Sequence, residues 1–226
     1  MKHIIIIASI LLFLGCTKSK DLEKTAVENN TVSDADGNTY KTVVIGAQTW
    51  FAENLKTTKF KDGTAIALVT DNTAWKNLTT PAYCWYNNSV SNKTTYGALY
   101  NWYTVSTANL CPAGWHVPSD SEWKILTDFL KGASTAGIKL KEAGTTHWNS
   151  PNTGATNESG FTALPGGYRD GYNGSFLNMG KVGCFLTPTI TILNSIAIRG
   201  GSYDRTDFGK GDCFNKDGLS VRCIKD

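Results

Sequence analysis

The chain has 226 residues, of which 41% are hydrophobic and 18% are charged, a balance that suits one globular domain with a full-sized core. The formal net charge of +3 is small and evenly spread, which argues against nucleic acid as a partner. Seven Trp, nine Tyr and nine Phe indicate a packed, β-rich core, and they can also place exposed rings on loops that bind a ligand.

The N-terminus has the features of a lipoprotein signal peptide. Lys2 is followed by the mostly apolar residues 4–14, which as a helix would rise only about 16 Å and could not span a bilayer. Gly15 supplies the small residue before Cys16, and the ending resembles a bacterial lipobox. We predict that residues 1–15 are removed and that Cys16 is lipidated. The alternative is an ordinary leader in which Cys16 plays no part.

Residues 16–30 are polar, lack aromatic side chains and show no strong periodicity, so we expect a flexible tether there. The folded domain is then expected over residues 31–226. This organisation predicts a protein that contacts the membrane through its lipid anchor in the bacterial outer membrane, and that is either periplasmic or surface-exposed.

Residues 32–55 are rich in Thr, Val, Ile and Tyr around a turn at Gly37, which predicts a β-hairpin. Asp34, Asp36 and Asn38 have the alternating spacing of a calcium loop. Such a loop needs Gly at its sixth position and Glu at its twelfth, whereas Gly37 is fourth and Ile45 is twelfth. We therefore expect a turn and no metal ion.

Two aromatic segments follow. Residues 81–90 predict a short strand that runs into an Asn-rich turn. In residues 96–105 the apolar side chains recur with helical spacing, and we expect them to pack the core rather than to form a binding stripe. The members of that pattern are Tyr96, Leu99, Tyr100 and Tyr103.

A helix is predicted to begin at Ser119. Ser119 and Glu122 have the spacing of a capping box, and Gly132 is expected to end the helix. Its apolar face carries Trp123, Leu126 and Leu130. His116, just before this helix, has no second ligand or nucleophile near it in the sequence, and we expect a core or hydrogen-bonding histidine.

Residues 143–180 are crowded with Gly, Asn, Thr and Ser, yet they keep several aromatic residues that a disordered linker would lack. We expect an ordered, loop-rich region, which is where function usually lies. Strands are expected again at 184–193 and 195–203, and a short terminal strand within 218–226.

Six stretches occur in order over nearly all of residues 32–226: DGNTYKTVVIGAQTWFAENL, YCWYNN, YGALYNWY, LCPAGWHVPSDSEW, NESGFTALPGGYR and LSVRC. Together they resemble one known family, the Fibrobacter succinogenes major paralogous domain. This domain occurs on secreted and lipid-anchored proteins, chiefly of the Bacteroidota. The resemblance implies an α+β, C-type-lectin-like fold with a mixed or antiparallel sheet, two main helices and a long loop-rich region, distantly similar to formylglycine-generating enzymes. It brings no established activity.

The cysteines add expectations about disulfides. Without Cys16, five remain at positions 84, 111, 184, 213 and 223, so at least one stays unpaired and two bridges can be chosen in fifteen ways. Lectin-like domains commonly tie a cysteine near a helix to the last strand, which implies Cys111–Cys223.

The chain also departs from the family pattern near two of its cysteines. It has CFLTPT where an aromatic Trp-Ser-Ser segment is expected, and Cys213 is additional. Their joint appearance predicts a Cys184–Cys213 bridge, which leaves Cys84 as a buried free thiol. The rival is Cys84–Cys111 with Cys223 left over.

Nothing in the sequence predicts an enzyme or a cofactor. Only His116 and His147 remain after the leader, and the common hydrolase, zinc and phosphate-loop motifs are absent. Cys84 stands between Tyr83 and Trp85, a poor setting for a thiolate. A formylglycine-type oxidase would need a reactive cysteine pair that is served by copper, and the placement of these cysteines does not favour one.

A binding module is the preferred function, with a carbohydrate or a protein as ligand. In a lectin-like fold the ligand would contact the loops 142–160, 168–180 and 202–217. Neither lectin sugar-binding triplet (Glu-Pro-Asn or Trp-Asn-Asp) occurs. The alternative is a structural or assembly component of a surface appendage. The candidate ligand contacts are Trp148, Asn149, Asn152, Tyr168, Arg169, Tyr172, Tyr203 and Asp204.

Overall fold

The computed structural model describes residues 31–192 and 195–226, which form a mixed α/β structure of mostly short strands and few helices. The predicted signal peptide, the lipidated Cys16 and the tether lie outside the described residues. Within the described residues, no helix is long and apolar enough to cross a membrane.

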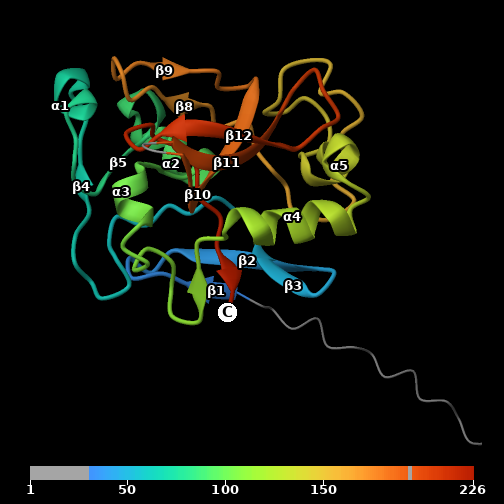
Figure 1. The fold of residues 1–226 in the computed structure, drawn as a ribbon, viewed down its shortest axis with the longest axis horizontal. Coiled ribbons are helices and arrows are strands. Elements are labelled where there is room, and N and C mark those ends of the chain that lie inside the picture. Colours follow the sequence, from blue (N-terminus) through green and yellow to red (C-terminus); the bar gives the residue numbers. More distant parts are fainter. Residues whose placement is uncertain (1–30, 193–194) are drawn as a thin grey trace, which may run out of the picture.

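The two ends of the domain meet in one antiparallel sheet with the strand order β1-β2-β3-β13-β7 (Figure 1). Its strands are β1 (Thr31–Ser33), β2 (Thr39–Ile45), β3 (Gln48–Phe51), β7 (Trp115–His116) and β13 (Ile224–Lys225). The predicted hairpin at the start of the domain is confirmed. Asp34 closes its turn, because its carboxylate accepts the backbone N–H groups of Asp36 and Asn38, both at 2.9 Å.

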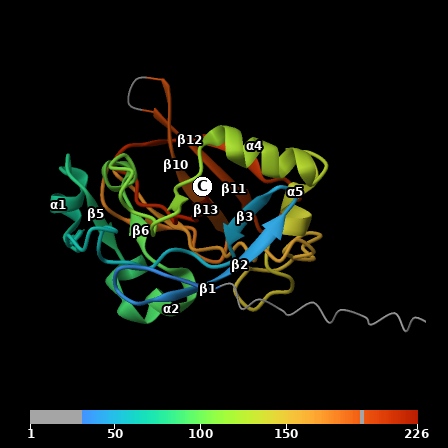
Figure 2. The same ribbon diagram turned by 90° about the horizontal axis from the view of Figure 1, so that it is seen from below.

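A second antiparallel sheet contains β10 (Val182–Ile192), β11 (Ser195–Ser202) and β12 (Gly209–Phe214). The strands predicted from 184 and from 195 onward are therefore confirmed. Pro188 lies in β10 where the register with β11 shifts, as expected for a residue that cannot donate a ladder hydrogen bond. Where β10 ends and β11 begins, the two strands project from the body of the molecule (Figure 2).

Helix α4 (Asp120–Phe129) lies between these two sheets (Figure 1). The predicted capping box is present: the Ser119 hydroxyl accepts from the Glu122 N–H at 3.3 Å, and the Glu122 carboxylate accepts from the Ser119 N–H at 2.8 Å. Trp123 on the inner face contacts Trp50 of β3 and Phe185 of β10, with ring centroids 4.8 and 5.4 Å apart. This aromatic cluster joins the helix to both sheets.

The prediction of one helix over residues 96–105 is wrong. The chain instead forms α2 (Lys93–Tyr96), β6 (Leu99–Tyr100) and α3 (Trp102–Val105). Gly97 breaks the pattern: it has a φ of 73°, and a Cβ there would lie 2.6 Å from the Leu55 carbonyl oxygen. The expected core role is confirmed for Leu99 and Tyr100, which are buried.

The remaining elements are short. They are α1 (Asn72–Lys76), α5 (Ala133–Leu140), β4 (Ala67–Leu68), β5 (Ala82–Cys84), β8 (Tyr168–Arg169), β9 (Phe176–Leu177) and two 3₁₀ turns at Tyr86–Asn88 and Val90–Asn92. The strand predicted within residues 81–90 is thus β5. Residues 143–180 contain only β8 and β9, so the predicted loop-rich region is confirmed.

One of the two expected disulfides is present. Cys111 and Cys223 are bonded, with their Cα atoms 6.0 Å apart, which ties the segment before α4 to the strand at the end of the chain. The rival pairing of Cys84 with Cys111 is therefore wrong. Cys84 is a buried free thiol, as predicted.

The expected Cys184–Cys213 bridge is wrong, and both thiols are free. Cys184 faces Gly200 and Cys213 faces Ile196 from opposite sides of β11. Neighbouring strands lie about 4.8 Å apart, so β10 and β12, which have β11 between them, are separated by roughly 10 Å. A disulfide needs Cα atoms within about 7 Å. Both cysteines depart from the family pattern, but this shared departure did not mean that they lie on adjacent strands.

Candidate functional site

The residues proposed from the sequence for ligand binding do not form one site, because three of them are buried. Trp148, Asn152 and Arg169 are 1%, 4% and 0% exposed. The Trp148 indole donates to the Ala163 carbonyl at 3.0 Å, and the Asn152 amide donates to two loop carbonyls at 2.8 and 2.6 Å. The prediction that these three side chains contact a ligand is wrong, since they hold the loops together.

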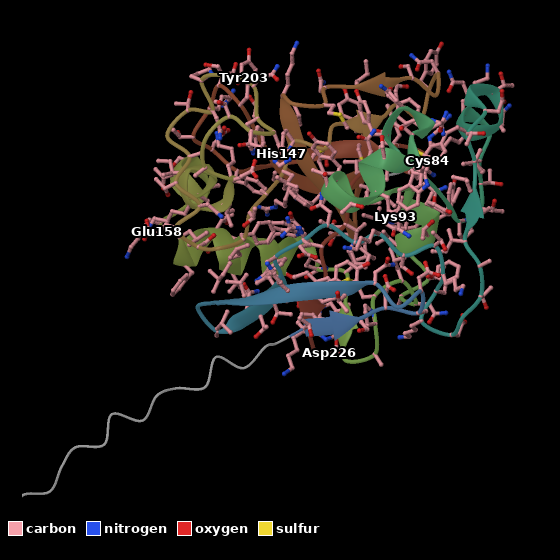
Figure 3. All side chains as sticks on the ribbon, turned by 180° about the vertical axis from the view of Figure 1, so that it is seen from behind. Cys84, Lys93, His147, Glu158, Tyr203 and Asp226 are labelled. Carbon is pink, nitrogen blue, oxygen red and sulfur yellow. A yellow bond between two sulfur atoms is a disulfide. The ribbon has the colours of Figure 1, made fainter. Side chains whose placement is uncertain are left out.

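Tyr203 and Asp204 belong to a different part of the surface from Tyr172, since Asp204 and Tyr172 line separate pockets. Figure 3 shows Tyr203 and Cys84 in different halves of the molecule. The loop of Tyr203 and Asp204 is supported from below by the buried Lys141, whose ammonium donates to three backbone carbonyls. These belong to Thr153 (3.3 Å), Ser202 (3.1 Å) and Arg205 (2.8 Å). Burial lowers the pKa of Lys141, while Asp204 and Asp207 oppose this shift.

The two remaining candidates outside the β8–β9 turn are also separated. Asn149 is exposed, and its backbone N–H donates to the Gly180 carbonyl at 2.7 Å. Tyr168 is half-buried and packs against the main hydrophobic cluster. Neither lies with Tyr172. Tyr172 lines a groove that is larger than the separate pocket of about 480 Å³ at Asp204.

This groove has a volume of about 840 Å³ and is formed by Lys76 and Asn77 of α1 and its C-cap, residues 171–173 of the β8–β9 turn, and residues 214–216 at and after the end of β12. We call it the aromatic groove. In Figure 1, β12 runs toward the end of the molecule that carries α1, and β8 and β9 lie beside it. Its volume is within the range of about 300–1,000 Å³ that is usual for ligand sites.

Two large rings in the aromatic groove are left open to solvent. Tyr172 is 85% exposed and Phe214 is 63% exposed. The sequence pointed to Tyr172 through its loop, but Phe214 was missed. Burial alternates along β12, and Phe214 occupies one of its outward positions, where a polar residue is the usual choice. The sequence alone could not identify Phe214 as an exposed ring, because its outward position depends on the strand and its register.

The loops that carry the rings are joined by one carboxylate. Asp217 accepts the backbone N–H of Gly171 at 2.7 Å and that of Phe214 at 2.9 Å. Burial raises the pKa of Asp217, although these two hydrogen bonds oppose the shift. Gly171 permits the close approach, because a Cβ at this position would lie 2.7 Å from the Cβ of Lys216. The rings are therefore presented by loops that have a fixed separation.

Arg169 forms the base of the same region. Its guanidinium lies between the rings of Trp75 and Phe176, at 4.4 and 4.8 Å from their centroids. It donates four hydrogen bonds to the segments around it. The acceptors are the carbonyls of Gly174 (2.9 Å), Val69 (2.6 Å) and Thr70 (2.8 Å) and the Asn72 side chain (2.9 Å). Arg169 thus joins α1 to the β8–β9 turn, and it supports the groove without facing it.

The free thiols are poor nucleophiles. Burial raises the pKa of Cys84 and of Cys184 to about 12, and it raises the pKa of Cys213 as well. At neutral pH these groups are protonated. Within residues 31–192 and 195–226, no group of three or more His, Cys, Asp or Glu side chains could hold a metal ion.

Both histidines of the domain are hydrogen-bonded to carboxylates. His116 bridges Asp226 at 2.6 Å and Glu122 at 2.8 Å, so it joins the last residue of the chain to α4. Its partial burial acts to lower its pKa, but the two carboxylates outweigh burial and raise it. The expectation of a hydrogen-bonding histidine is confirmed. His147 pairs with Glu142 at 2.9 Å.

Comparison with known proteins identifies the family of this domain, which has mostly antiparallel sheets and long loops. Residues 43–225 match the Fibrobacter succinogenes major domain, and the chain therefore belongs to that family. No curated protein and no solved structure is significantly similar to it. The resemblance inferred from the sequence is confirmed, and β1, which precedes the matched residues, pairs with β2 in the first sheet.

Proposed function

We propose that this protein is a non-catalytic binding or adhesion module of the bacterial cell envelope and that the aromatic groove is its ligand site. The carrying observation is the pair of exposed rings, Tyr172 and Phe214, on loops that Asp217 and Arg169 hold in place. Exposed aromatic residues on a rigid base bind ligands at a low cost in conformational entropy. The ligand is a glycan or a protein of the envelope.

The scaffold in this proposal is C-type-lectin-like, with Cys16 lipidated and the protein anchored in the outer membrane. Support for the scaffold comes from the Cys111–Cys223 bridge, which links the segment before a main helix to the last strand. Support for a non-catalytic role comes from the raised pKa values of the Cys84 and Cys184 thiols. Support for the anchor comes from the apolar leader, residues 1–15, which is followed directly by Cys16.

Binding to isolated cell envelopes tests the proposal. The full-length protein, extracted in detergent, is titrated against envelopes from the cells that produce it. We expect Tyr172→Ala with Phe214→Ala to reduce binding at least about tenfold, because hot-spot aromatics carry most of the energy of an interface. Val90→Ala serves as the control, since Val90 is 68% exposed outside the groove. Equal binding by the double variant and the control would refute the proposal.

Pretreatment of the envelopes identifies the kind of ligand. Periodate cleaves sugar rings and protease removes proteins, so loss of binding after one treatment assigns the ligand to that class.

A structural role in a surface appendage is the second candidate, and one observation favours it. β12 is the outer strand of the β10-β11-β12 sheet, and among the described residues no other strand pairs with its outer edge. Such an edge can accept a strand from another chain. Co-purification of the protein with surface polymers, lost when a proline replaces Gly211 in β12, would support this role. Assembly that is unaffected by the proline would exclude strand addition at β12.

A further inference from the structure

We propose that the aromatic groove binds an acidic saccharide, a chain of sugar residues that carry carboxylate or sulfate groups. This inference rests on the proposed function and specifies its ligand. Its basis is the chemistry of the lining, which combines two exposed rings with the ammonium groups of Lys76 and Lys216. Three asparagine side chains complete the lining, and no carboxylate is part of it.

The free polar groups of the groove are mostly hydrogen-bond donors. Among the described residues, the Lys76 ammonium and the Asn77 side chain have no hydrogen-bond or ion-pair partner, and both are exposed. Asn173 uses its side-chain oxygen to accept from the Ser175 N–H at 2.8 Å, which leaves its amide hydrogens free. Lys216 donates one hydrogen bond, to the Lys76 carbonyl at 2.8 Å, and has two hydrogens left. A ligand rich in acceptors satisfies this set.

Two acids adjoin the lining residues in the sequence, and the carboxylates of both accept backbone hydrogen bonds. Asp217 accepts two backbone N–H groups, and Asp170 accepts those of Tyr172 and Asn173 at 2.7 and 3.0 Å. Neither carboxylate lines the groove. A ligand anion therefore meets two ammonium groups directly and is not opposed by a lining carboxylate.

The exposed rings distinguish a saccharide from other anions. A pyranose ring has apolar C–H faces that can lie against Tyr172 and Phe214, while its hydroxyl and carboxylate oxygens accept from the lysines and amides. A free phosphate or sulfate ion would leave both rings in water. Nucleic acid calls for a longer row of cations along its phosphates, and this chain has a formal net charge of only +3. The volume of about 840 Å³ accommodates a short run of sugar residues.

Matched polysaccharides test this ligand class. The full-length protein in detergent is immobilised and titrated with polygalacturonate, alginate and chondroitin sulfate. The neutral counterpart is fully methyl-esterified polygalacturonate, which keeps the backbone and loses the charge. We expect at least one acidic polymer to bind, with an affinity that falls as salt is raised, and the methyl ester to bind at least about tenfold more weakly.

Variants of the protein provide the second arm. Lys76→Gln and Lys216→Gln should each weaken binding by about tenfold and reduce its dependence on salt, because each removes one charge-assisted contact. Lys124→Gln is the matched control, since Lys124 is 67% exposed on α4, where it pairs with Asp128 and lies outside the lining of the groove. Near-UV circular dichroism verifies that every variant is folded.

The outcomes separate this inference from the proposed function. If Tyr172→Ala abolishes binding to envelopes but the methyl ester binds as well as the acid, the groove is a binding site and the acidic ligand is wrong. If no polysaccharide binds while protease-sensitive binding to envelopes persists through the groove, the saccharide is likewise refuted. Acid-specific binding that Lys124→Gln weakens as much as Lys76→Gln would also overturn the inference, because the charge effect would not belong to the groove.

Discussion

Replacing Arg169 by lysine tests the idea that the aromatic groove depends on a rigid base. The buried guanidinium donates four hydrogen bonds, at 2.6 to 2.9 Å, to α1, to the residues just before it and to the β8–β9 turn. A lysine keeps the positive charge but has one nitrogen, which cannot reach acceptors spread around a planar fork. The carbonyls of Val69, Thr70 and Gly174 would then compete for that single group.

The expected magnitude follows from the number of bonds. Each hydrogen bond to a charged group contributes about 1.5–3 kcal/mol, so four of them would sum to roughly 6–12 kcal/mol if they were additive. They are not additive, because all four acceptors bond to one guanidinium. In the lysine variant some of these acceptors would bond to water or to the lysine ammonium instead. We therefore expect Arg169→Lys to lower the free energy of unfolding by about 2–4 kcal/mol. Arg169→Met, which also removes the charge, should cost about 3–5 kcal/mol.

Arg222→Lys is the matched control. Arg222 is equally buried and also donates four hydrogen bonds, but it lies away from the groove. Its acceptors are the carbonyls of Phe51 (2.8 Å), Phe161 (2.6 Å) and Thr162 (2.8 Å) and the Asn54 side chain (2.8 Å). Urea unfolding followed by tryptophan fluorescence should show similar destabilisation for the two variants. Ligand titration at a temperature where both are folded should show weaker binding for Arg169→Lys alone.

Two results would contradict the reasoning. Equal loss of binding in both variants would mean that general destabilisation, and not the groove base, controls affinity. Unchanged binding by a folded Arg169→Lys would mean that α1 and the β8–β9 turn keep their positions without the guanidinium.

Three further predictions concern the anchor, the disulfide and the C-terminus. Cys16→Ala should abolish acylation and release the protein in soluble form, and unchanged membrane fractionation would refute lipidation. Cys111→Ala with Cys223→Ala should lower the free energy of unfolding by about 4–5 kcal/mol, because the bridge spans 112 residues; urea unfolding measures it. The folded-state pKa of His116 is raised, so its stabilising contribution is complete below its unfolded pKa and is lost as pH rises through the folded value. Thermal unfolding from pH 5 to 9 should show this loss, and His116→Gln should remove it.

Local signals in the sequence predicted local structure correctly. The capping box of Ser119 and Glu122 and the turn at Gly37 depend on residues within a few positions, so their chemistry is visible in the chain itself. The helix expected over residues 96–105 failed for the opposite reason. Gly97 is held against Leu55, a contact between segments far apart in sequence that no periodicity can reveal.

The candidate site was predictable only in part. Tyr172 stands in a Gly- and Asn-rich turn that marks an exposed loop, so its residue type and setting identify it. Arg169 and Trp148 lie in equally loop-rich sequence, yet they are buried, because long loops need side chains that satisfy their backbone carbonyls and fill their interior. Phe214 and the free Cys213 depend on the register of β12, which is a tertiary property.

The buried cations explain how a chain with so much irregular backbone can present a rigid surface. Arg169, Arg222 and Lys141 are each fully buried, and within the described residues none forms an ion pair by direct contact with a carboxylate. Each donates mainly to backbone carbonyls, most of which lie in loops. A buried carbonyl without a partner costs about 1–3 kcal/mol, so these donors hold in place the loops whose carbonyls accept their hydrogen bonds. Loops fixed from beneath can leave rings such as Tyr172 in water without collapsing over them. The shape of the aromatic groove therefore depends on Arg169. Substitution of this residue should change the affinity for any ligand more than substitutions in the sheets do.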